Sequence, residues 1–457
     1  MTETKTAAVI LAAGLGTRMQ SAMPKVLHRL AGRPMLAHLL DTVAALDLGP
    51  IVVVTGPGMD AVAAAAKPHP AAVQSEQLGT GHAVLAAKNA LKGHSGDILV
   101  LFGGDPLISA TTIEKLLSAR AEKPAPAPRP DIVVLGFEAD DPGHYGRLVT
   151  NADGSLEAIV EAAEATEEQL AVTLCNSGVM LISGEHAWGL LGRVDNDNAK
   201  GEIYLTDIIA LAREDGLICA VVTGDERELL GIDSRADLAC AEAFVQNQLR
   251  RAAMDAGATL TDPDTVFFCH DTQIGRDVTI GPNVVFGPGV TVADNVEIRA
   301  FCHIEGATVA SGAIIGPFAR LRPGAELARD VHIGNFVEIK NAAIEAGARV
   351  NHLAYIGDAR VGAKANIGAG TITCNYDGFE KHHTDIGKAA FIGSNTALVA
   401  PVKVGDGAVI GAGSVITKDV AADALCVTRA PRKEIPGGAT AQKVRKAKNA
   451  KKMKGKK

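Results

Sequence analysis

The sequence lacks the features that mark a membrane span, an exported chain or a disulfide framework. No stretch approaches the ~18 uninterrupted apolar residues of a membrane-spanning helix, so we expect no span. The first residues, Met1 to Lys5, do not form a signal-peptide pattern before the first apolar run. The 7 cysteines are odd in number and scattered, without a CxxC pair. Reduced thiols in a cytoplasmic protein fit this usage best.

Aromatic residues are also few, at 4% of the chain, whereas glycine is abundant, with 49 residues. This balance favours a core of stacked aliphatic segments over one built around large rings. With 47% hydrophobic and 21% charged residues, the remaining composition is that of an ordinary globular protein. A length of 457 residues predicts two or three domains.

Acidic residues are missing from the last part of the chain. The net charge is −7, yet the segment after Pro436 carries only cations: Lys443, Arg445, Lys446, Lys448, Lys451, Lys452, Lys454, Lys456 and Lys457. Nucleic-acid binding, or a role in framing the site of an anionic ligand, would be the functional interpretations. We expect a solvated, disordered tail and no nucleic-acid partner.

The second half of the chain carries an imperfect six-residue rhythm. An aliphatic residue followed by glycine recurs at intervals that are mostly multiples of six or one residue off: Ile274-Gly275, Ile280-Gly281, Ile315-Gly316, Ile333-Gly334, Ile356-Gly357, Ile367-Gly368, Ile386-Gly387, Ile392-Gly393, Val404-Gly405 and Ile410-Gly411. This period predicts a parallel β-helix, in which each hexad is one short strand and a corner. A non-repeating segment at 373–385 predicts a loop that leaves one corner.

The first half alternates apolar strands with helical patterns, which indicates βαβ order and a mostly parallel sheet. Strands are expected at 7–11, 51–55 and 98–102, and helices at 36–46 and 81–92. A helical apolar pattern with few breakers predicts a connecting helix at 235–256. We therefore divide the chain into an α/β domain at 1–235, a linker helix at 236–256, a β-helix domain at 257–436 and a basic tail at 437–457.

The strongest local motif follows the first strand. Leu11-Ala12-Ala13-Gly14-Leu15-Gly16-Thr17-Arg18-Met19 precedes Pro24-Lys25. Glycines after a strand let backbone N–H groups approach a phosphate. Met19 stands where a dinucleotide fingerprint has its third glycine, and no P-loop lysine motif is present. Arg18 and Lys25 instead supply the cations that in-line attack on a nucleotide α-phosphate needs.

This motif resembles the signature of the sugar-1-phosphate nucleotidylyltransferases. The resemblance extends over Gln74 with Gly79-Thr80-Gly81-His82-Ala83, Tyr145-Gly146-Arg147, Ile159-Val160-Glu161, Asn176-Ser177-Gly178, and Asn196-x-Asn198-Ala199-x-Gly201-Glu202-x-Tyr204-x-Thr206-Asp207. With the hexad half attached, almost the whole chain is similar to the bifunctional bacterial enzymes that make UDP-N-acetylglucosamine.

The resemblance implies a fold and two activities. It implies an α/β plus all-β chain: a Rossmann-like nucleotidyltransferase domain, a long linker helix and a left-handed parallel β-helix. The expected reactions are acetyl transfer from acetyl-CoA to glucosamine-1-phosphate, then uridylyl transfer from UTP to the N-acetylated product, with Mg²⁺ and release of pyrophosphate. A homotrimer with shared acetyltransferase sites is also implied.

The resemblance carries roles over to matching residues of the first domain. Uracil and ribose would be held by Leu11, Ala12, Ala13, Gly14, Gln74, Gly79 and Thr80. The phosphates would be engaged by Arg18 and Lys25, and the N-acetylated sugar by Gly146, Glu161 and Asn176.

The expected Mg²⁺ ligands depart from the family pattern. The family has Gly-Asp-x-Pro after a strand, whereas this chain has Gly103-Gly104-Asp105-Pro106, so Asp105 comes one place late. One step along an extended strand turns a side chain to the other face. Asp233 replaces a family Asn and is a good hard-oxygen ligand, so we name Asp105 and Asp233 as the metal ligands. A family Lys is also replaced, by Ala163.

Polar residues in the hexad half suit acetyl transfer to an amine, which needs a base, an oxyanion donor and cations for phosphate and coenzyme. His352 suits the base because its reference pKa lies near working pH, and Glu338 is close enough in register to orient it. The resemblance implies that glucosamine-1-phosphate is bound by Arg322, Lys340, Tyr355 and Asn366, and acetyl-CoA by Asn375, Tyr376, Ser394, Ala412 and Arg429.

Other interpretations stay open at this point. The β-helix of a sugar nucleotidylyltransferase could serve only for oligomerisation or regulation, and the first site could be impaired by the shifted Asp105. A non-catalytic regulatory subunit is a further possibility. A zinc site built from His303, His332, His382 and His383 is disfavoured, because their spacing gives no His-x₄-His pair.

Overall fold

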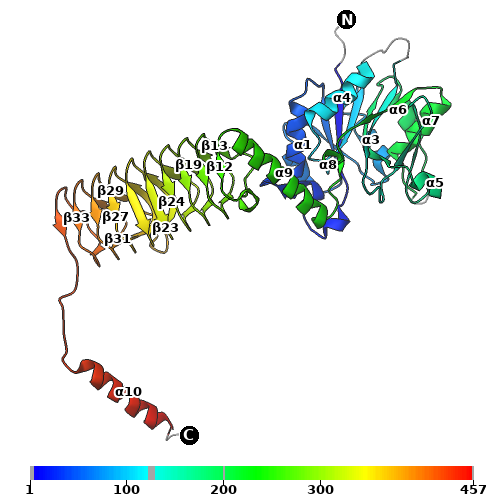
Figure 1. Cartoon of the computed structure of the whole chain (residues 1–457). Coiled ribbons are helices and arrows are strands. Elements are labelled where there is room, and N and C mark those ends of the chain that lie inside the picture. Colours follow the sequence, from blue (N-terminus) through cyan, green and yellow to red (C-terminus); the bar gives the residue numbers. More distant parts are fainter. Residues whose placement is uncertain (1–4, 122–128, 199–200, 455–457) are drawn as a thin grey trace. The chain divides into compact units, whose positions relative to one another are not determined.

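The computed structural model describes residues 5–121, 129–198 and 201–454. By its internal contacts the chain divides into two compact units. The first comprises Met1–Ala253 with Phe267–Asp271, and the second comprises Met254–Val266 with Thr272–Lys457. Figure 1 shows helices packed around a sheet in the first unit and a stack of short strands in the second.

The first unit is built on a mixed sheet in the order β11-β7-β10-β6-β1-β4-β5. These strands are β1 (Ala7–Ala12), β4 (Ile51–Thr55), β5 (Ala71–Val73), β6 (Ile98–Phe102), β7 (Ile132–Glu138), β10 (Leu174–Ile182) and β11 (Cys219–Thr223). Strand β10 runs antiparallel to both of its neighbours, β6 and β7. The remaining pairs along this order are parallel. The predicted strands are therefore confirmed, and β1 lies inside the sheet.

Both faces of this sheet are covered, which explains why β1 is apolar at every position. Val9 and Leu11 belong to one core cluster with Val84 of α3 (Thr80–Ala86). Ile10 belongs to the opposite cluster with Leu39 of α1 (Met35–Ala44). Alternate side chains of a strand point to opposite faces, so a strand covered on both sides must be apolar throughout. The result is a three-layer α/β arrangement whose parallel strands β1 and β6 end at one common edge.

Two expectations about the boundaries differ from the structure. The connecting helix α9 spans Arg235–Asp255, close to its predicted bounds, but most of it belongs to the first unit. Gln246 of α9 donates to the carbonyl of Phe268 and accepts from its N–H, which ties the segment at 267–271 to the helix. The tail, expected to be disordered, forms helix α10 (Gly438–Lys454); residues 455–457 lie outside the described part.

The second unit is a left-handed parallel β-helix with three ladders of strands. Face A contains β12 (Thr259–Leu260), β14 (Thr279–Ile280), β17 (Glu297–Ile298), β20 (Ile314–Ile315), β23 (His332–Asn335), β25 (Arg349–His352), β27 (Asn366–Ile367), β30 (Phe391–Ile392), β33 (Val409–Ile410) and β35 (Leu425–Cys426). Successive strands on this face are parallel and in register, as in the pairing of Asn335 with His352.

Faces B and C complete each coil. Face B contains β15 (Val285–Phe286), β18 (His303–Ile304), β21 (Arg320–Leu321), the first parts of β24 (Glu338–Ile344) and β26 (Tyr355–Val361), β28 (Ile372–Cys374), β31 (Ala397–Val399) and β34 (Val415–Ile416). Face C contains β13 (Gln273–Ile274), β16 (Thr291–Val292), β19 (Ala307–Val309), β22 (Ala325–Leu327), the last parts of β24 and β26, β29 (Thr384–Ile386) and β32 (Val402–Val404).

One inward aliphatic side chain per strand builds the interior of this β-helix. On face A, Ile280, Ile298, Ile315 and Ile333 are each no more than 1% exposed. Burying such a side chain stabilises the fold by about 1.5–3 kcal/mol. The hexad glycines allow the coils to pack closely: a Cβ on Gly334 would lie 1.9 Å from the carbonyl oxygen of Asn351 on the next coil. The predicted alternation of core and corner is therefore confirmed.

The insertion at 373–385 leaves the corner between faces B and C, as predicted. It follows β28, returns at β29, and contains a bridge between Tyr376 and Lys381. Within the described residues, no helix has the length and apolar character needed to cross a membrane.

Neighbouring residues of β14 offer a direct test of the inward and outward alternation. Ile280 is fully buried, whereas Thr279 points outward. We expect Ile280→Ala to lower the free energy of unfolding of the β-helix by about 2–5 kcal/mol, because it leaves a cavity in the interior. The matched control, Thr279→Ala, should change it by no more than about 0.5 kcal/mol. Urea unfolding followed by circular dichroism measures both; equal losses would contradict this description of the core.

Candidate active sites

The first candidate site is a cavity of about 410 Å³ at the carboxyl ends of β1 and β6. Its lining includes eight of the predicted residues, namely Leu11, Ala12, Ala13, Gly14, Lys25, Gln74, Gly79 and Thr80. In open α/β sheets, ligands bind outside the carboxyl ends of the strands. The cavity therefore lies where the topology predicts a ligand site, and its size is that of a small-molecule pocket.

Lys25 is held against the glycine loop. Gly16 has φ +61°, and a Cβ there would lie 2.6 Å from Cβ of Lys25, so only glycine allows this approach. The Lys25 ammonium contacts Asp233 Oδ1 at 2.8 Å, and Arg18 contacts Asp233 Oδ2 at 2.7 Å. The two predicted phosphate-binding cations are thus brought together by one carboxylate, although Arg18 is largely exposed and does not line the cavity.

The loop from Gln74 to Thr80 closes another side of this cavity. Buried Gln74 donates through Nε2 to the carbonyl of Gly79 at 3.0 Å, and the same atom lies 3.2 Å from His82 Nδ1. Gly79 has φ +111°, and a Cβ there would lie 2.6 Å from the carbonyl oxygen of Ile203. This position therefore requires glycine, because the loop packs closely against the backbone of Ile203.

A second cavity, of about 240 Å³, adjoins the first because Thr80, Phe102 and Glu202 line both. Two predicted sugar-binding residues, Glu161 and Asn176, line it. The third, Gly146, does not, but its carbonyl accepts from the N–H of Asn176 at 2.8 Å. Gly146 therefore supports the site through the backbone.

Sequence reasoning missed several residues of these cavities, among them Gln77, Phe102 and Glu202. Gln77 donates to the carbonyl of Ala13 in the glycine loop. Glu202 belongs to the family motif at 196–207, but no role was assigned to it. Gln77 lies three places after Gln74, so its position in the same loop was the available signal.

The two carboxylates predicted to hold a metal, Asp105 and Asp233, differ in their exposure. Gly104 lines the first cavity, and a Cβ there would lie 2.5 Å from Lys25 Nζ. Asp105 is only 7% exposed and does not line this cavity. Burial raises the pKa of Asp105 to about 7; the charge of Lys25 opposes this rise and that of Asp233 adds to it.

These two carboxylates lie near each other, beside the backbone of Gly231. A Cβ on Gly231 would lie 3.5 Å from Asp105 Oδ1 and 3.8 Å from Asp233 Oδ2. Two neighbouring carboxylates supply the hard-oxygen donors that Mg²⁺ prefers. The residues present therefore fit a divalent cation, with Asp233 the more exposed ligand.

The second candidate site surrounds His352, which lies at the end of β25 on the corner between faces A and B. His352 Nδ1 lies 2.6 Å from Asn335 Oδ1. The expectation that Glu338 orients His352 is wrong, because Glu338 is paired with Arg322 at 2.8 Å. A cavity of about 420 Å³ adjoins His352, and its lining includes Arg299 and Arg349.

Three predicted sugar-phosphate residues share face B. Arg322 follows β21, and Lys340 and Tyr355 lie on β24 and β26. Lys340 Nζ is 3.8 Å from Asp358 Oδ2. Lys381, in the insertion, was not predicted; the nearby ammonium of Lys340 lowers its pKa. Two ammonium groups placed together form a site for an anion such as a phosphate.

The predicted coenzyme residues fall into two groups. Ser394 and Ala412 lie just after β30 and β33, at the same corner as His352. The N–H of Gly413 donates to the carbonyl of Ser394 at 2.8 Å, and a Cβ on Gly413 would lie 3.7 Å from Arg429 Cδ. Ser394, Ala412 and Arg429 therefore form a row along this corner.

Asn375 and Tyr376 start the insertion at the other corner of face B. Asn375 is buried and donates to Asp358, and the hydroxyl of Tyr376 donates to the carbonyl of Gly378 at 2.7 Å. Asn366, predicted to bind the sugar phosphate, lies on face A beside Arg349. Its side chain therefore faces away from Arg322 and Lys340 of the same chain, because outward side chains on two faces of a triangular prism diverge.

The histidines considered for zinc do not come together. His303 is on face B, His332 is on face A, and His382 pairs with Asp377 at 2.8 Å.

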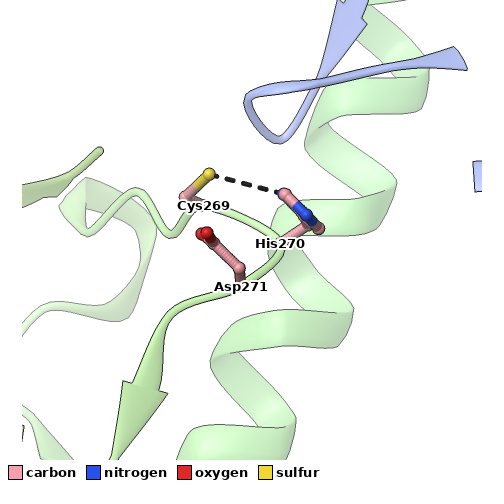
Figure 2. Close-up of side chains that lie close together, drawn as sticks. All are labelled: Cys269, His270 and Asp271. Atoms are coloured by element: carbon pink, nitrogen blue, oxygen red, sulfur yellow. Dashed lines mark hydrogen bonds between the residues drawn. The ribbon is translucent and has the colours of Figure 1, made fainter. Parts of the chain in front are cut away.

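One further group of possible metal ligands lies in the first unit, where Cys269, His270 and Asp271 have donor atoms within 4.8 Å of one another (Figure 2). Cys269 Sγ contacts the carbonyl of Ala31 at 3.2 Å and His270 Nδ1 at 3.5 Å. Burial raises the pKa of Cys269 to about 11, so its thiol stays protonated. We assign this group to packing.

Family models match parts of both units. The family model of the MobA-like NTP transferase domain matches residues 8–256. The model of the bacterial transferase hexapeptide (six repeats) matches residues 271–306 and 383–418.

Curated relatives match over nearly their whole length. A protein of Paramagnetospirillum magneticum named "Bifunctional protein GlmU" is 61% identical over 439 residues, 96% of this chain and 97% of the relative. Proteins of the same name from Rhodospirillum rubrum and Ruegeria are 62% and 56% identical over 436 and 438 residues, 95% of this chain and 97% and 96% of the relatives. The chain therefore belongs to the family of the bifunctional GlmU proteins.

Proposed function

We propose that this chain makes UDP-N-acetylglucosamine by two transfers at separate sites. The second unit would move acetyl from acetyl-CoA to the amine of glucosamine-1-phosphate. The first unit would then join the product to the uridylyl group of UTP and release pyrophosphate. The observation that carries the proposal is the presence, in one chain, of Lys25 in a glycine-loop cavity and of a hydrogen-bonded His352 on a β-helix corner. Both co-substrates are cytoplasmic metabolites, so we place the enzyme there.

In the first site, the glycine loop and Gln74 would hold the uridine, and Lys25 would face the phosphates. A phosphate oxygen of the sugar attacks the α-phosphorus of UTP, and the bond to the pyrophosphate oxygen breaks. Negative charge grows on the oxygens of the α-phosphate, and fixed cations stabilise it. Glu161 and Asn176 would orient the sugar from the adjoining cavity.

Asp233 and Asp105 would hold Mg²⁺ in this site. The cation, when bound, supplies charge that stabilises the phosphate oxygens. Asp233 also forms ion pairs with Lys25 and Arg18. A single carboxylate would therefore position both the metal and these two cationic side chains.

In the second site, His352 would act as the base. The amine nitrogen attacks the thioester carbonyl while an imidazole nitrogen takes its proton, and the C–S bond then breaks to release the thiol of CoA. Arg322, Lys340 and Lys381 would bind the sugar phosphate, and Tyr355 would contact the sugar. Ser394, Ala412 and Arg429 form the row along which the coenzyme would lie, while Asn375 and Tyr376 would contact it from the insertion.

We also propose a homotrimer in which neighbouring subunits complete the acetyltransferase site. Phe301, Phe318, Phe336 and Leu353 form an apolar ridge along the corner of His352, and are 51%, 45%, 55% and 60% exposed. The three phenylalanine rings stack with centroids 4.9 and 5.0 Å apart. An exposed apolar ridge of this kind marks an interaction surface. In such a trimer, face A of one chain, which bears Asn366, would lie opposite face B of a neighbouring chain.

The base assignment predicts a selective loss. His352→Ala should reduce acetyl transfer by about 10²–10⁴-fold, because the amine loses its proton acceptor. Uridylyl transfer should be unchanged, since His352 and the first cavity lie in different units. Thiol release from acetyl-CoA and pyrophosphate release from UTP measure the two rates. His303→Ala, an exposed histidine on face B, is the control; retained acetylation in His352→Ala would refute the assignment.

The metal assignment predicts a change in cation binding. Asp233→Asn should weaken binding of Mn²⁺, used as a spectroscopic probe for Mg²⁺, and raise the Mg²⁺ concentration needed for uridylyl transfer, because a carboxylate is lost. Asp47→Asn, at an exposed ion pair with Lys5, is the matched control. Electron paramagnetic resonance of free Mn²⁺ gives the binding curve. Unchanged Mn²⁺ binding in both Asp233→Asn and Asp105→Asn would place the metal elsewhere.

The ridge assignment predicts dissociation on charge insertion. Phe318→Glu places repelling carboxylates in the apolar ridge, so we expect loss of the trimer and of acetyl transfer with uridylyl transfer kept. Val73→Glu, at an exposed apolar position of the first unit, is the control. Size-exclusion chromatography with light scattering reports the mass; a Phe318→Glu protein that stays trimeric would remove the ridge from the interface.

A further inference from the structure

A hydrogen-bond partner is needed to fix the orientation and the tautomer of the His352 imidazole. A base must present an unprotonated nitrogen to the amine, and the partner of its other nitrogen decides which tautomer is present. Glu338 is unavailable, because its carboxylate is paired with Arg322 at 2.8 Å. The side chain within reach is Asn335, whose Oδ1 lies 2.6 Å from His352 Nδ1.

The β-helix places Asn335 there by strand register. Asn335 ends β23, His352 ends β25, and the two are direct partners in the parallel ladder of face A. The carbonyl of Asn335 also accepts from the N–H of Leu353 at 3.0 Å. Gly334, just before Asn335, lets the two coils approach closely. Both the side chain and the backbone of Asn335 thus form hydrogen bonds to the segment that contains His352.

The chemistry of an amide oxygen decides the direction of this bond. A carbonyl oxygen only accepts, so Nδ1 of His352 must carry the proton and donate to Oδ1 of Asn335. Nε2 then has its lone pair free. The opposite tautomer would place a proton on Nε2 and could not accept one from an amine.

We propose that Asn335 is the positioning residue of the acetyl-transfer site: its Oδ1 accepts Nδ1–H of His352 and so holds Nε2 unprotonated for the amine. This inference rests on the proposed acetyl transfer. As the N–C bond forms, Nε2 takes one proton from the amine, and the imidazolium keeps its Nδ1–H bond to Asn335. The proton then leaves with the thiol of CoA when the C–S bond breaks. Asn335 itself gains and loses no proton.

Charged groups surround the base, and they bear on its pH dependence. Arg299, Arg349 and His332 line the cavity that adjoins His352, and Glu338 and Tyr355 follow on face B. A neutral amide at 335 adds no charge to these surroundings, whereas a carboxylate there would add a negative charge beside the imidazole.

Two variants of Asn335 test the inference. Asn335→Leu keeps the shape but removes the acceptor, and we expect about a 10–100-fold loss in kcat/KM for acetyl transfer, the range found for groups that orient a metal-ligating imidazole. Most of the loss should be in kcat, because the sugar-binding side chains are unchanged. Asn335→Asp keeps the acceptor; we expect it to regain most of the rate and to move the acidic limb of the pH profile to higher pH, because the carboxylate favours the imidazolium.

Controls separate this role from a structural one. Gln273→Leu removes an outward amide from the first coil, and should leave both activities unchanged. Circular dichroism of each variant reports whether the β-helix is folded, and uridylyl transfer reports whether the first unit is folded. Full acetyl-transfer activity in Asn335→Leu would overturn the proposal. So would an Asn335→Asp variant that is as slow as Asn335→Leu and whose pH profile keeps its acidic limb at the wild-type pH.

A readout without turnover distinguishes failure of this inference from failure of the proposed function. Nitrogen chemical shifts of labelled histidine, with His352→Ala used for assignment, should show Nδ1–H in the wild type and a mixture of tautomers in Asn335→Leu. A wild type with Nε2–H would refute the role of Asn335 even if acetyl transfer runs. A wild type with Nδ1–H but no acetyl transfer would instead refute the proposed function.

Discussion

The inward aliphatic side chain of each hexad is the constraint on which the second unit depends. Ile333 and Val350 can both be buried in the interior only if their coils are in register. That same register places the outward residues of successive coils side by side. His352 therefore meets Asn335, 17 residues earlier, without any dedicated loop to bring them together. The geometry of the proposed acetyl-transfer site is thus a consequence of core packing.

The first unit obeys a different constraint. Its parallel strands are covered on both faces, so polar side chains can gather only at the strand ends. The glycine loop after β1 meets the loop after β6 at that edge, and Lys25 occupies the space beside Gly104. A carboxylate at residue 104 would have to share that space with the ammonium of Lys25. The acidic partner of Lys25 comes instead from Asp233.

Much of this organisation could be predicted from the sequence. The hexad rhythm predicted the β-helix because its period reflects core packing, and the apolar runs predicted β1, β4 and β6. Side-chain partners were harder: Glu338 and Asn335 both precede His352 by nearly one coil, and only the ladder shows which is in register. The helix of the tail and the place of Lys381 depend on segments without periodicity, where pattern reasoning has no signal.

The central claim is that one chain carries two working sites, and the most direct measurement assays both half-reactions on one preparation. Thiol release would be followed with acetyl-CoA and glucosamine-1-phosphate, and pyrophosphate release with UTP and N-acetylglucosamine-1-phosphate across a Mg²⁺ titration. We predict that both reactions run and that the second depends on Mg²⁺. Thiol release without pyrophosphate release at any Mg²⁺ concentration would contradict the account, and would show that Gly104 and the buried Asp105 have disabled the first site.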